Sequence, residues 1–423
     1  IFIYLLLGFL FNYLILYIDT MIHLLKGSIG AGILAMPDAM SRVGVITGFI
    51  GIVVVGIIAT YCIHLLISAQ YQLCKRHKKG YMSYSKSLHV ALKDGPKCMR
   101  KCAKSAACFV DAVLVLWQLG LCCVYIVFVA SNIKQVMDYY SLAFSLRMHI
   151  VFLLIPLTIV NMVMDLKLLT PLSTVSNLLT ILGLLLVFFY LVEDDIVVRE
   201  ENLYKASLDG LPIFVGTTLF ALEAVGVVLA LEYNMEEPKQ FVGICGLFNI
   251  GMTVIVSLYA LVGIFGYLKY NDNIKASITL NLPEHEKKAQ VAKSLMALAI
   301  FLTYPLQNFV AYSILIRKLR KKLKPEVVVY GDFMLRIVLI VVPWGCAWLV
   351  PTLGPFISLF GALCLSLLAL VFPALLDICT HHPTGYGTCS YMLVRDVALA
   401  VIGLACLVAG CYTSLLEIIE ERK

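Results

Sequence analysis

The sequence predicts an all-α polytopic membrane protein with about 11 transmembrane helices. Of its 423 residues, 61% are hydrophobic and only 14% are charged, whereas a soluble domain carries roughly 25% charged residues. Apolar stretches long enough to cross a bilayer recur along the whole chain. Short basic segments separate some of these stretches, which is the charge pattern of cytoplasmic loops. Because the basic residues adjoin membrane spans and do not form one folded face, the net charge of +7 does not predict nucleic-acid binding.

The two ends of the chain differ from the membrane domain between them. Residues 1–18 are almost wholly apolar and lack the basic start and the small-residue cleavage site of a signal peptide. Together with the segment that follows, they are too long for one span. Residues 1–18 are expected to be either an additional hydrophobic segment or a gene-model artefact or truncated start, and we favour the second interpretation. The transmembrane domain is expected over residues 19–416, and residues 417–423 are expected to form a short polar tail.

The first span, over residues 19–37, is predicted to be discontinuous. Three glycines and Ser28 interrupt it, and glycine in a helix interior costs about 1 kcal/mol relative to alanine. Unwound backbone at membrane depth is tolerated where it is buried in protein or lines a wet cavity. Its N–H and C=O groups, with the partial charges of the nearby helix ends, can then bind a ligand. The alternative is a face of small residues for close helix packing, although Gly27, Gly30 and Gly32 lack the spacing of Gly-x-x-x-Gly.

Ten further spans follow in order. We expect them at residues 43–69, 106–130, 148–164, 172–192, 212–233, 241–267, 289–316, 335–350, 354–376 and 391–416. Ten Lys and Arg residues lie between Lys75 and Lys104, six lie between Arg317 and Lys324, and residues 193–209 form an acidic loop. Eleven spans with a cytoplasmic start place both basic loops inside and the acidic loop outside, so the topology agrees with the charge bias.

The sixth span is the second interrupted one. It contains Gly216, Gly226 and a carboxylate, Glu223, in its middle. The first and sixth spans stand five apart, which predicts an inverted 5+5 repeat permease fold with discontinuous helices 1 and 6. In such a fold the substrate site lies where the two broken helices face each other, and the eleventh helix lies outside the repeat.

Four blocks of sequence resemble the proton-coupled amino acid transporters, a branch of the amino acid/auxin permease group. They are His23-Leu-Leu-Lys-Gly-Ser-Ile-Gly-Ala-Gly-Ile-Leu, Gln118-Leu-Gly-Leu-Cys-Cys-Val-Tyr-Ile-Val-Phe, Phe220-Ala-Leu-Glu-Ala-Val-Gly and Ser277-Ile-Thr-Leu-Asn-Leu-Pro. The resemblance extends from about Asp19 to the C-terminus. It implies the inverted-repeat permease fold of the bacterial leucine transporter and the symport of protons with small neutral amino acids such as glycine, alanine and proline. Two features depart from the family pattern, namely the apolar residues 1–18 in place of a polar tail and outer loops without cysteine.

The substrate site is expected at the two helix breaks. The residues whose backbone is expected to bind the carboxylate of an amino acid are Ser28, Ile29, Gly30, Ala31 and Gly32. The residues expected to offer carbonyl groups to its ammonium group are Phe220, Ala221 and Leu222. Tyr125 is a further candidate for the cavity wall.

Two ionisable residues are candidates for proton coupling or gating. His23 precedes the first break, and histidine titrates near neutral pH, which suits a proton acceptor. Glu223 lies in the middle of the sixth span, where a desolvated carboxyl group can hold a proton. The structural alternatives are an imidazole bonded to a backbone carbonyl and a carboxyl group bonded to a neighbouring helix.

Other functions of the same fold remain open at the level of sequence. A sodium-coupled symporter needs additional oxygen ligands on the eighth span, where Thr303 and Ser313 stand ten residues apart, which argues against it. An amino-acid sensor with little flux is the second alternative. No enzyme motif and no standard metal spacing is present, so we expect neither catalysis nor a cofactor. The chain is expected in the plasma membrane or in a lysosomal or endosomal membrane.

Overall fold

The computed structural model describes residues 21, 24–25, 30–162, 166–193, 199–203, 205, 209–222, 243, 246–321, 324–387 and 390–420. Their helices are α2 (Ala31–Val43), α3 (Val45–Arg76), α4 (Tyr84–Asp94), α5 (Lys97–Arg100), α6 (Ala103–Tyr139), α7 (Leu146–Met162), α8 (Leu166–Val192), α9 (Glu200–Leu203), α10 (Leu211–Ala221), α12 (Leu247–Tyr270), η2 (Asn271–Asn273), η3 (Ile278–Asn281), α13 (Lys287–Arg320), α14 (Pro325–Leu349), α15 (Leu353–Phe360), η4 (Gly361–Val371), α16 (Phe372–His381) and α17 (Tyr391–Glu420). Within these ranges there is no β-strand. The predicted all-α fold is confirmed.

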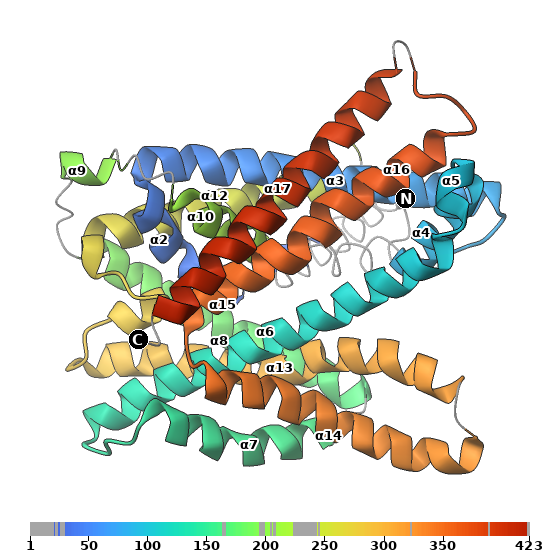
Figure 1. Cartoon of the computed structure of the whole chain (residues 1–423). Helices are drawn as coiled ribbons and strands as arrows, with labels where there is room; N and C mark the ends of the chain where they lie inside the picture. Colours follow the sequence, from blue (N-terminus) through green and yellow to red (C-terminus); the bar gives the residue numbers. More distant parts are fainter. Residues whose placement is uncertain are drawn as a thin grey trace, which may run out of the picture.

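Long apolar helices cross the molecule from end to end (Figure 1). Eight described helices or helix runs are long and apolar enough to span a membrane, and α7 and α10 are shorter apolar helices. Length explains this distinction, because about 20 apolar residues at 1.5 Å per residue cross the hydrocarbon core. The predicted spans at 106–130 and 391–416 thus appear as α6 and α17, each extended by residues that continue the helix beyond the bilayer core.

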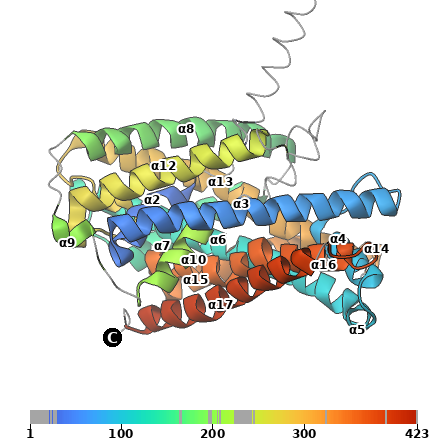
Figure 2. The same ribbon diagram turned by 90° about the horizontal axis from the view of Figure 1, so that it is seen from above.

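The helices form groups that are visible from above (Figure 2). α13 packs along both α6 and α8, and α14 packs against α6, α7 and α13. A second group consists of α2, α3, α10 and α12, and the continuous run α15–η4–α16 joins it to α17. Polar side chains tie members together, as where the Trp344 Nε1–H donates to the carbonyl of Ile150 at 2.8 Å, linking α14 to α7. α8 and α17 lie at opposite edges of the bundle.

The first helix continues further than its proline suggests. Pro37 lies inside α2, which runs on to Val43. Proline removes one backbone donor and crowds the preceding turn, which often ends a helix. Here α2 is almost wholly buried between α10 and α12, and this packing holds the helix together through the proline. The expectation that the first span ends at Pro37 is therefore wrong, and six more residues belong to the helix.

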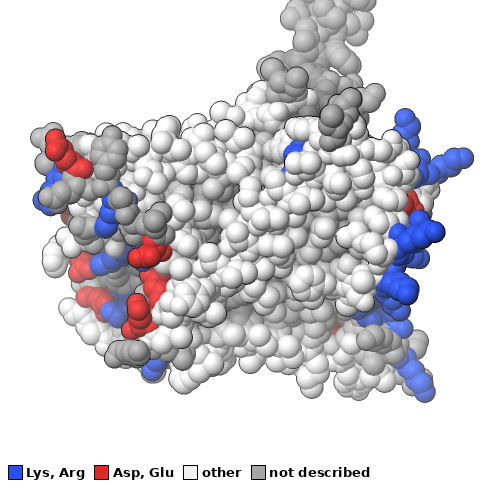
Figure 3. Space-filling model, turned by 45° about the horizontal axis from the view of Figure 1, so that its top comes forward, with Lys and Arg blue, Asp and Glu red and all other residues white. Residues whose placement is uncertain are grey.

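On the face shown in Figure 3, charged side chains gather at the two ends of the bundle and leave its middle almost uncharged. One end is dominated by Lys and Arg, as expected for the loops on either side of α4 and α5 and after α13. The other end carries acidic and basic residues together. The apolar band between two polar ends is what a membrane-embedded bundle requires, because charged side chains are costly within the hydrocarbon.

Candidate functional site

The start of α2 and the end of α10 meet inside the bundle. We call this meeting point the helix junction and define it as Gly30–Gly32 together with Phe220–Leu222. A Cβ atom placed on Gly32 would lie 2.5 Å from the Cα of Ala221, so the two backbones are in direct contact. The structure therefore brings together two segments that lie far apart in the sequence.

The partial charges at the helix junction have opposite signs. Gly30 is the N-cap of α2 and has no side chain with which to cap the first-turn N–H groups, which are the donors that a helix start leaves without an intrahelical partner. Leu222 follows the last residue of α10, where carbonyl groups point out of the helix. A helix N-terminus attracts anions and a C-terminus attracts cations. The junction can thus bind a group that carries both charges.

Tyr125 stands beside the start of α2. A Cβ atom on Gly30 would lie 3.7 Å from the Tyr125 hydroxyl oxygen, and the tyrosine itself is buried on α6. The hydroxyl can donate to or accept from a ligand at the break. The candidate residue on the third span is therefore next to the candidate residues of the first span.

Aromatic side chains enclose the end of α10. Trp117 of α6 contacts Phe220 edge to face, with ring centroids 5.2 Å apart. The Tyr259 hydroxyl of α12 donates to the Ala221 carbonyl at 2.8 Å and satisfies one of the carbonyl groups at the helix end. The sequence predicts neither Trp117 nor Tyr259 at the site. The residue types alone do not predict a role at the site, since aromatic residues are common in membrane spans.

A small cavity adjoins Tyr125. Its volume is about 10 Å³, enough for about one water molecule. Ile126, Leu157 and Phe301 share its wall with Tyr125, and Tyr304 of α13 closes one side. An amino acid does not fit in this space as it stands. A ligand larger than water therefore requires the surrounding helices to separate.

Several predicted site residues lie outside the described part of the chain. They are His23, Ser28, Ile29 and Glu223. Of the remaining candidates, Gly30, Ala31 and Gly32 form the first turn of α2, and Phe220, Ala221 and Leu222 form the end of α10. These six residues and Tyr125 thus converge on one region.

The broken first helix also carries a carboxylate that the sequence does not place at the site. Asp38 of α2 is mostly buried, and Arg42 lies 3.6 Å from it across one helical turn. The same guanidinium pairs with Glu417 of α17 at 2.6 Å. A helix end at Pro37, which the sequence predicts, would put Asp38 in a loop. The spacing of four between Asp38 and Arg42 is the available signal for a helix that continues.

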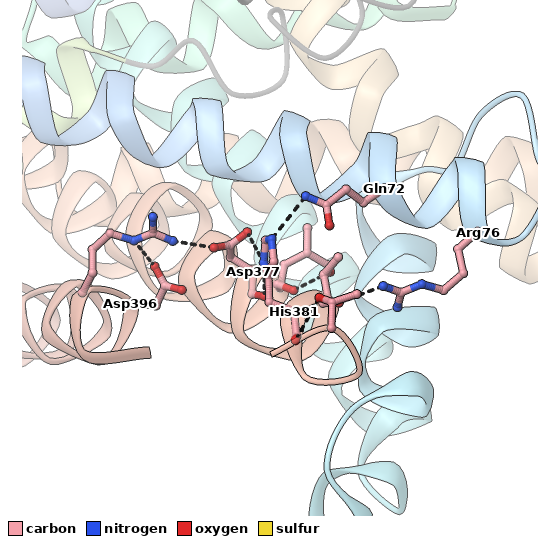
Figure 4. A network of polar contacts seen from close by, with 9 residues as sticks. Gln72, Arg76, Asp377, His381 and Asp396 are labelled. Carbon is pink, nitrogen blue, oxygen red and sulfur yellow. Dashed lines mark hydrogen bonds and ion pairs between the residues drawn. The ribbon is translucent and has the colours of Figure 1, made fainter. Parts of the chain in front are cut away.

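The largest described cluster of buried charge lies elsewhere, between α3, α16 and α17 (Figure 4). Arg395 donates to Asp377 at 2.5 Å and to Asp396 at 2.7 Å, and both carboxylates are almost fully buried. His381 lies 3.2 Å from Asp377 through its Nδ1 and 3.2 Å from the Gln72 amide through its Nε2. With Gln72 as the donor, Nε2 accepts, and Nδ1 carries the proton that it donates to the backbone carbonyl of Asp377 at 3.1 Å. We call these five residues the α16–α17 polar cluster.

The Thr303 hydroxyl, the candidate sodium ligand on the eighth span, is hydrogen-bonded within α13 and to α8. Thr303 and Ser176 lie 2.6 Å apart between α13 and α8, and Ser176 also donates to the Ala299 carbonyl at 2.7 Å. Ser313 donates to the carbonyl of Val310 at 2.9 Å on its own helix. Thr303 is thus directed at α8, whereas a pair of ligands facing α2 would be needed.

The whole membrane domain is similar in sequence to known transporters. Residues 16–416 match the family described as "Transmembrane amino acid transporter protein". The Drosophila melanogaster "Proton-coupled amino acid transporter-like protein pathetic" is 38% identical over 403 residues, which cover 95% of this chain and 85% of that protein. The Arabidopsis thaliana "Amino acid transporter ANT1" is 25% identical over 420 residues, covering 95% of this chain and 92% of that protein.

The fold is similar to that of a solved transporter as well. The structure described as "Inward facing conformation of Mhp1" matches 96% of this chain and 89% of its own, with a TM-score of 0.59 and 13% identity. At that identity the likeness concerns the fold alone, and it confirms the predicted permease fold with inverted repeats. On the sequence match over almost its entire length, the chain is a member of the transmembrane amino acid transporter family.

Proposed function

We propose that this protein moves small neutral amino acids of the glycine, alanine and proline class across a membrane by proton symport. The observation that carries the proposal is the helix junction, where the positive end of α2 meets the negative end of α10. A zwitterionic amino acid offers one carboxylate and one ammonium group, which match the two helix ends. Membership of the family supplies the substrate class in its coarse form.

The proposed binding mode uses the backbone on both sides. The carboxylate accepts hydrogen bonds from the N–H groups of residues 28–32, and the ammonium group donates to carbonyl oxygens of Phe220, Ala221 and Leu222. The Ala221 carbonyl already accepts from Tyr259, but a carbonyl oxygen has two lone pairs and retains capacity for a second donor. Tyr125 adds a hydroxyl at the α2 side.

Size and charge both favour small neutral substrates. Trp117, Phe220 and Tyr125 occupy the space around the junction, and the backbones of Gly32 and Ala221 are in direct contact there. α2 and α10 must therefore move apart to admit a substrate, as gating of one helix group against another allows in transporters of this kind. A second carboxylate on the substrate would face Glu223 in the proposed site, so acidic amino acids should be rejected.

Proton coupling is assigned to His23 and Glu223. The unperturbed pKa of histidine, about 6.5, lies within reach of the pH difference across a biological membrane. His23→Ala should abolish proton-driven accumulation, and Glu223→Gln should mimic the protonated state and weaken the dependence on pH. The contact of the Thr303 hydroxyl with Ser176 of α8, and not with α2, supports a proton over sodium as the driving ion.

The test is uptake into proteoliposomes that contain the purified protein. Glycine, alanine and proline should accumulate under an inward proton gradient without sodium, and they should compete with one another, whereas glutamate should not compete. Uptake that follows a sodium gradient and ignores pH would contradict the proton mechanism. Binding of the same amino acids with no measurable uptake would instead favour a sensor.

A further inference from the structure

A second cavity lies at the basic end of the molecule, away from the helix junction. Its volume is about 240 Å³, and it is bounded by the start of α4, by α6 and by the end of α13. Three cations of the α13 end line it, namely Arg317, Lys318 and Lys321. Ser83 and Ser85 at the start of α4 and Asp111 on α6 form other parts of the wall.

Basic residues outnumber acidic residues on the wall of this cavity. Lys318 pairs with Asp111 at 2.7 Å. Arg317 uses its Nε to donate to the Ser313 carbonyl at 2.9 Å, which leaves its two terminal amino groups for other acceptors. Among the described residues, neither Arg317 nor Lys321 has a carboxylate within ion-pair distance. Three cations and one carboxylate leave an excess of two positive charges on the wall.

The start of α4 adds hydroxyl-bearing residues to the cavity wall. Ser83 precedes α4, and its own carbonyl accepts from the N–H of Ser87 at 2.8 Å, whereas the Ser83 side chain makes no capping bond. Ser83 and Ser85 thus place two hydroxyl-bearing residues on the same cavity wall as the cations, and a hydroxyl can donate a hydrogen bond to an anion. The N-terminal end of the 11-residue helix α4 contributes additional positive potential.

We propose that this cavity binds a phosphorylated anion, either the phosphorylated headgroup of a membrane lipid or a soluble phosphate ester. Arg and Lys form strong charge-assisted hydrogen bonds to phosphate oxygens. Basic pockets between transmembrane helices on the cytoplasmic side suit such headgroups. The helix dipole and the cytoplasmic charge bias account for cations at the end of α13, but they do not require the cations to border a cavity that serines also line.

The site can be tested on the purified full chain independently of transport. The measurement is the binding of a fluorescent phosphatidylinositol bisphosphate to protein in phosphatidylcholine nanodiscs, with soluble inositol trisphosphate and inorganic phosphate as competitors. The double variant Arg317→Ala/Lys321→Ala should weaken binding by at least about tenfold, because each cation near the surface contributes substantially to anion affinity. The control Arg320→Ala/Lys324→Ala removes the same two charge types from the same basic segment, at the last residue of α13 and the N-cap of α14, outside the cavity wall, and should change binding by less than about threefold.

A third variant acts in the opposite direction. Asp111→Asn removes the only acidic wall residue among those described and releases Lys318, so it should tighten binding by about threefold or more. Misfolding does not produce such a gain. Competition by soluble inositol trisphosphate at concentrations similar to the lipid would identify a soluble ester as the ligand, and preference for the lipid would identify the headgroup. Equal losses in both double variants, or weaker binding in Asp111→Asn, would overturn the proposal.

Discussion

The helix junction and the α16–α17 polar cluster are two buried polar regions of opposite construction. At the junction, the described side chains are small, aliphatic or aromatic, and the polar groups belong to the backbone ends of α2 and α10. In the cluster, the polar groups are side chains, with two buried carboxylates on one guanidinium. Backbone groups can exchange one partner for another without leaving an unpaired charge in the interior. Paired charges cannot separate without that cost.

This difference indicates which part of the bundle can move during transport. A substrate can replace the contacts of the junction as it arrives and leaves. The cluster fastens α17 to α16 and, through Gln72, to α3, and we expect it to stay intact while the substrate is transported. At the far end of α17, Glu417 pairs with Arg42 of α2. We infer that the cluster is an anchor and that the junction is the working site.

The largest expected loss of stability follows from a change in the anchor. Arg395→Ala leaves Asp377 and Asp396 buried without their common partner, and breaking a buried ion pair typically costs about 3–5 kcal/mol of folding free energy. Thermal unfolding in detergent should show a much lower midpoint or no folded protein. The triple variant Asp377→Leu/Arg395→Met/Asp396→Leu, which removes every charge of the triad, should recover most of that loss. A midpoint for Arg395→Ala equal to that of the wild type would contradict the role as an anchor.

A smaller loss of stability is expected where the two helices touch. Gly32→Ala places a methyl group against the Ala221 backbone, and overpacking of this kind costs about 1–3 kcal/mol. Gly30→Ala is the matched control, because among the described residues its methyl group meets only the Tyr125 hydroxyl, at an ordinary distance of 3.7 Å. Differential scanning fluorimetry should rank the midpoints as wild type, Gly30→Ala and Gly32→Ala, in decreasing order. The reverse ranking of the two variants would place the close contact elsewhere.

The smallest effect on stability is expected for Tyr125→Phe, which preserves the ring. Loss of one hydrogen bond to the substrate, worth about 1 kcal/mol, should raise the KM for alanine uptake by roughly fivefold with little change in the unfolding midpoint. Tyr140→Phe on the exposed end of α6 is the control and should leave the KM unchanged. An unaltered KM in Tyr125→Phe would remove this hydroxyl from the site.

The sequence predicts the spans well because length and hydropathy decide them. It also predicts the junction, because interrupted helices five spans apart are typical of inverted repeats whose broken helices face each other. Gly32 shows where that reasoning was incomplete, since its lack of a side chain serves the close contact with Ala221. The packing interpretation therefore applies at Gly32, and the ligand-site interpretation of the stretch stays a prediction.

The sequence does not predict the anchor, the α16–α17 polar cluster, and the reason is physical. Asp377, His381, Arg395 and Asp396 lie at the ends of two helices that flank a loop, which is where charged residues are common and usually solvated. Only the packing of α16 against α17 and α3 buries them. The involvement of Trp117 and Tyr259 in the site likewise depends on how helices cross, which a single sequence does not specify.

The most direct test of the division between working site and anchor is the stabilisation of the purified protein by its substrate. A ligand that binds only the folded state raises stability by about 2.7 kcal/mol at a concentration of 100 times its Kd. Saturating alanine should raise the unfolding midpoint of the wild type and of the Asp377→Leu/Arg395→Met/Asp396→Leu variant by similar amounts. It should leave that of Gly30→Val unchanged, because the added side chain lies between α2 and Tyr125. A normal shift in Gly30→Val, or loss of the shift in the triple variant alone, would contradict the assignment of the substrate to the helix junction.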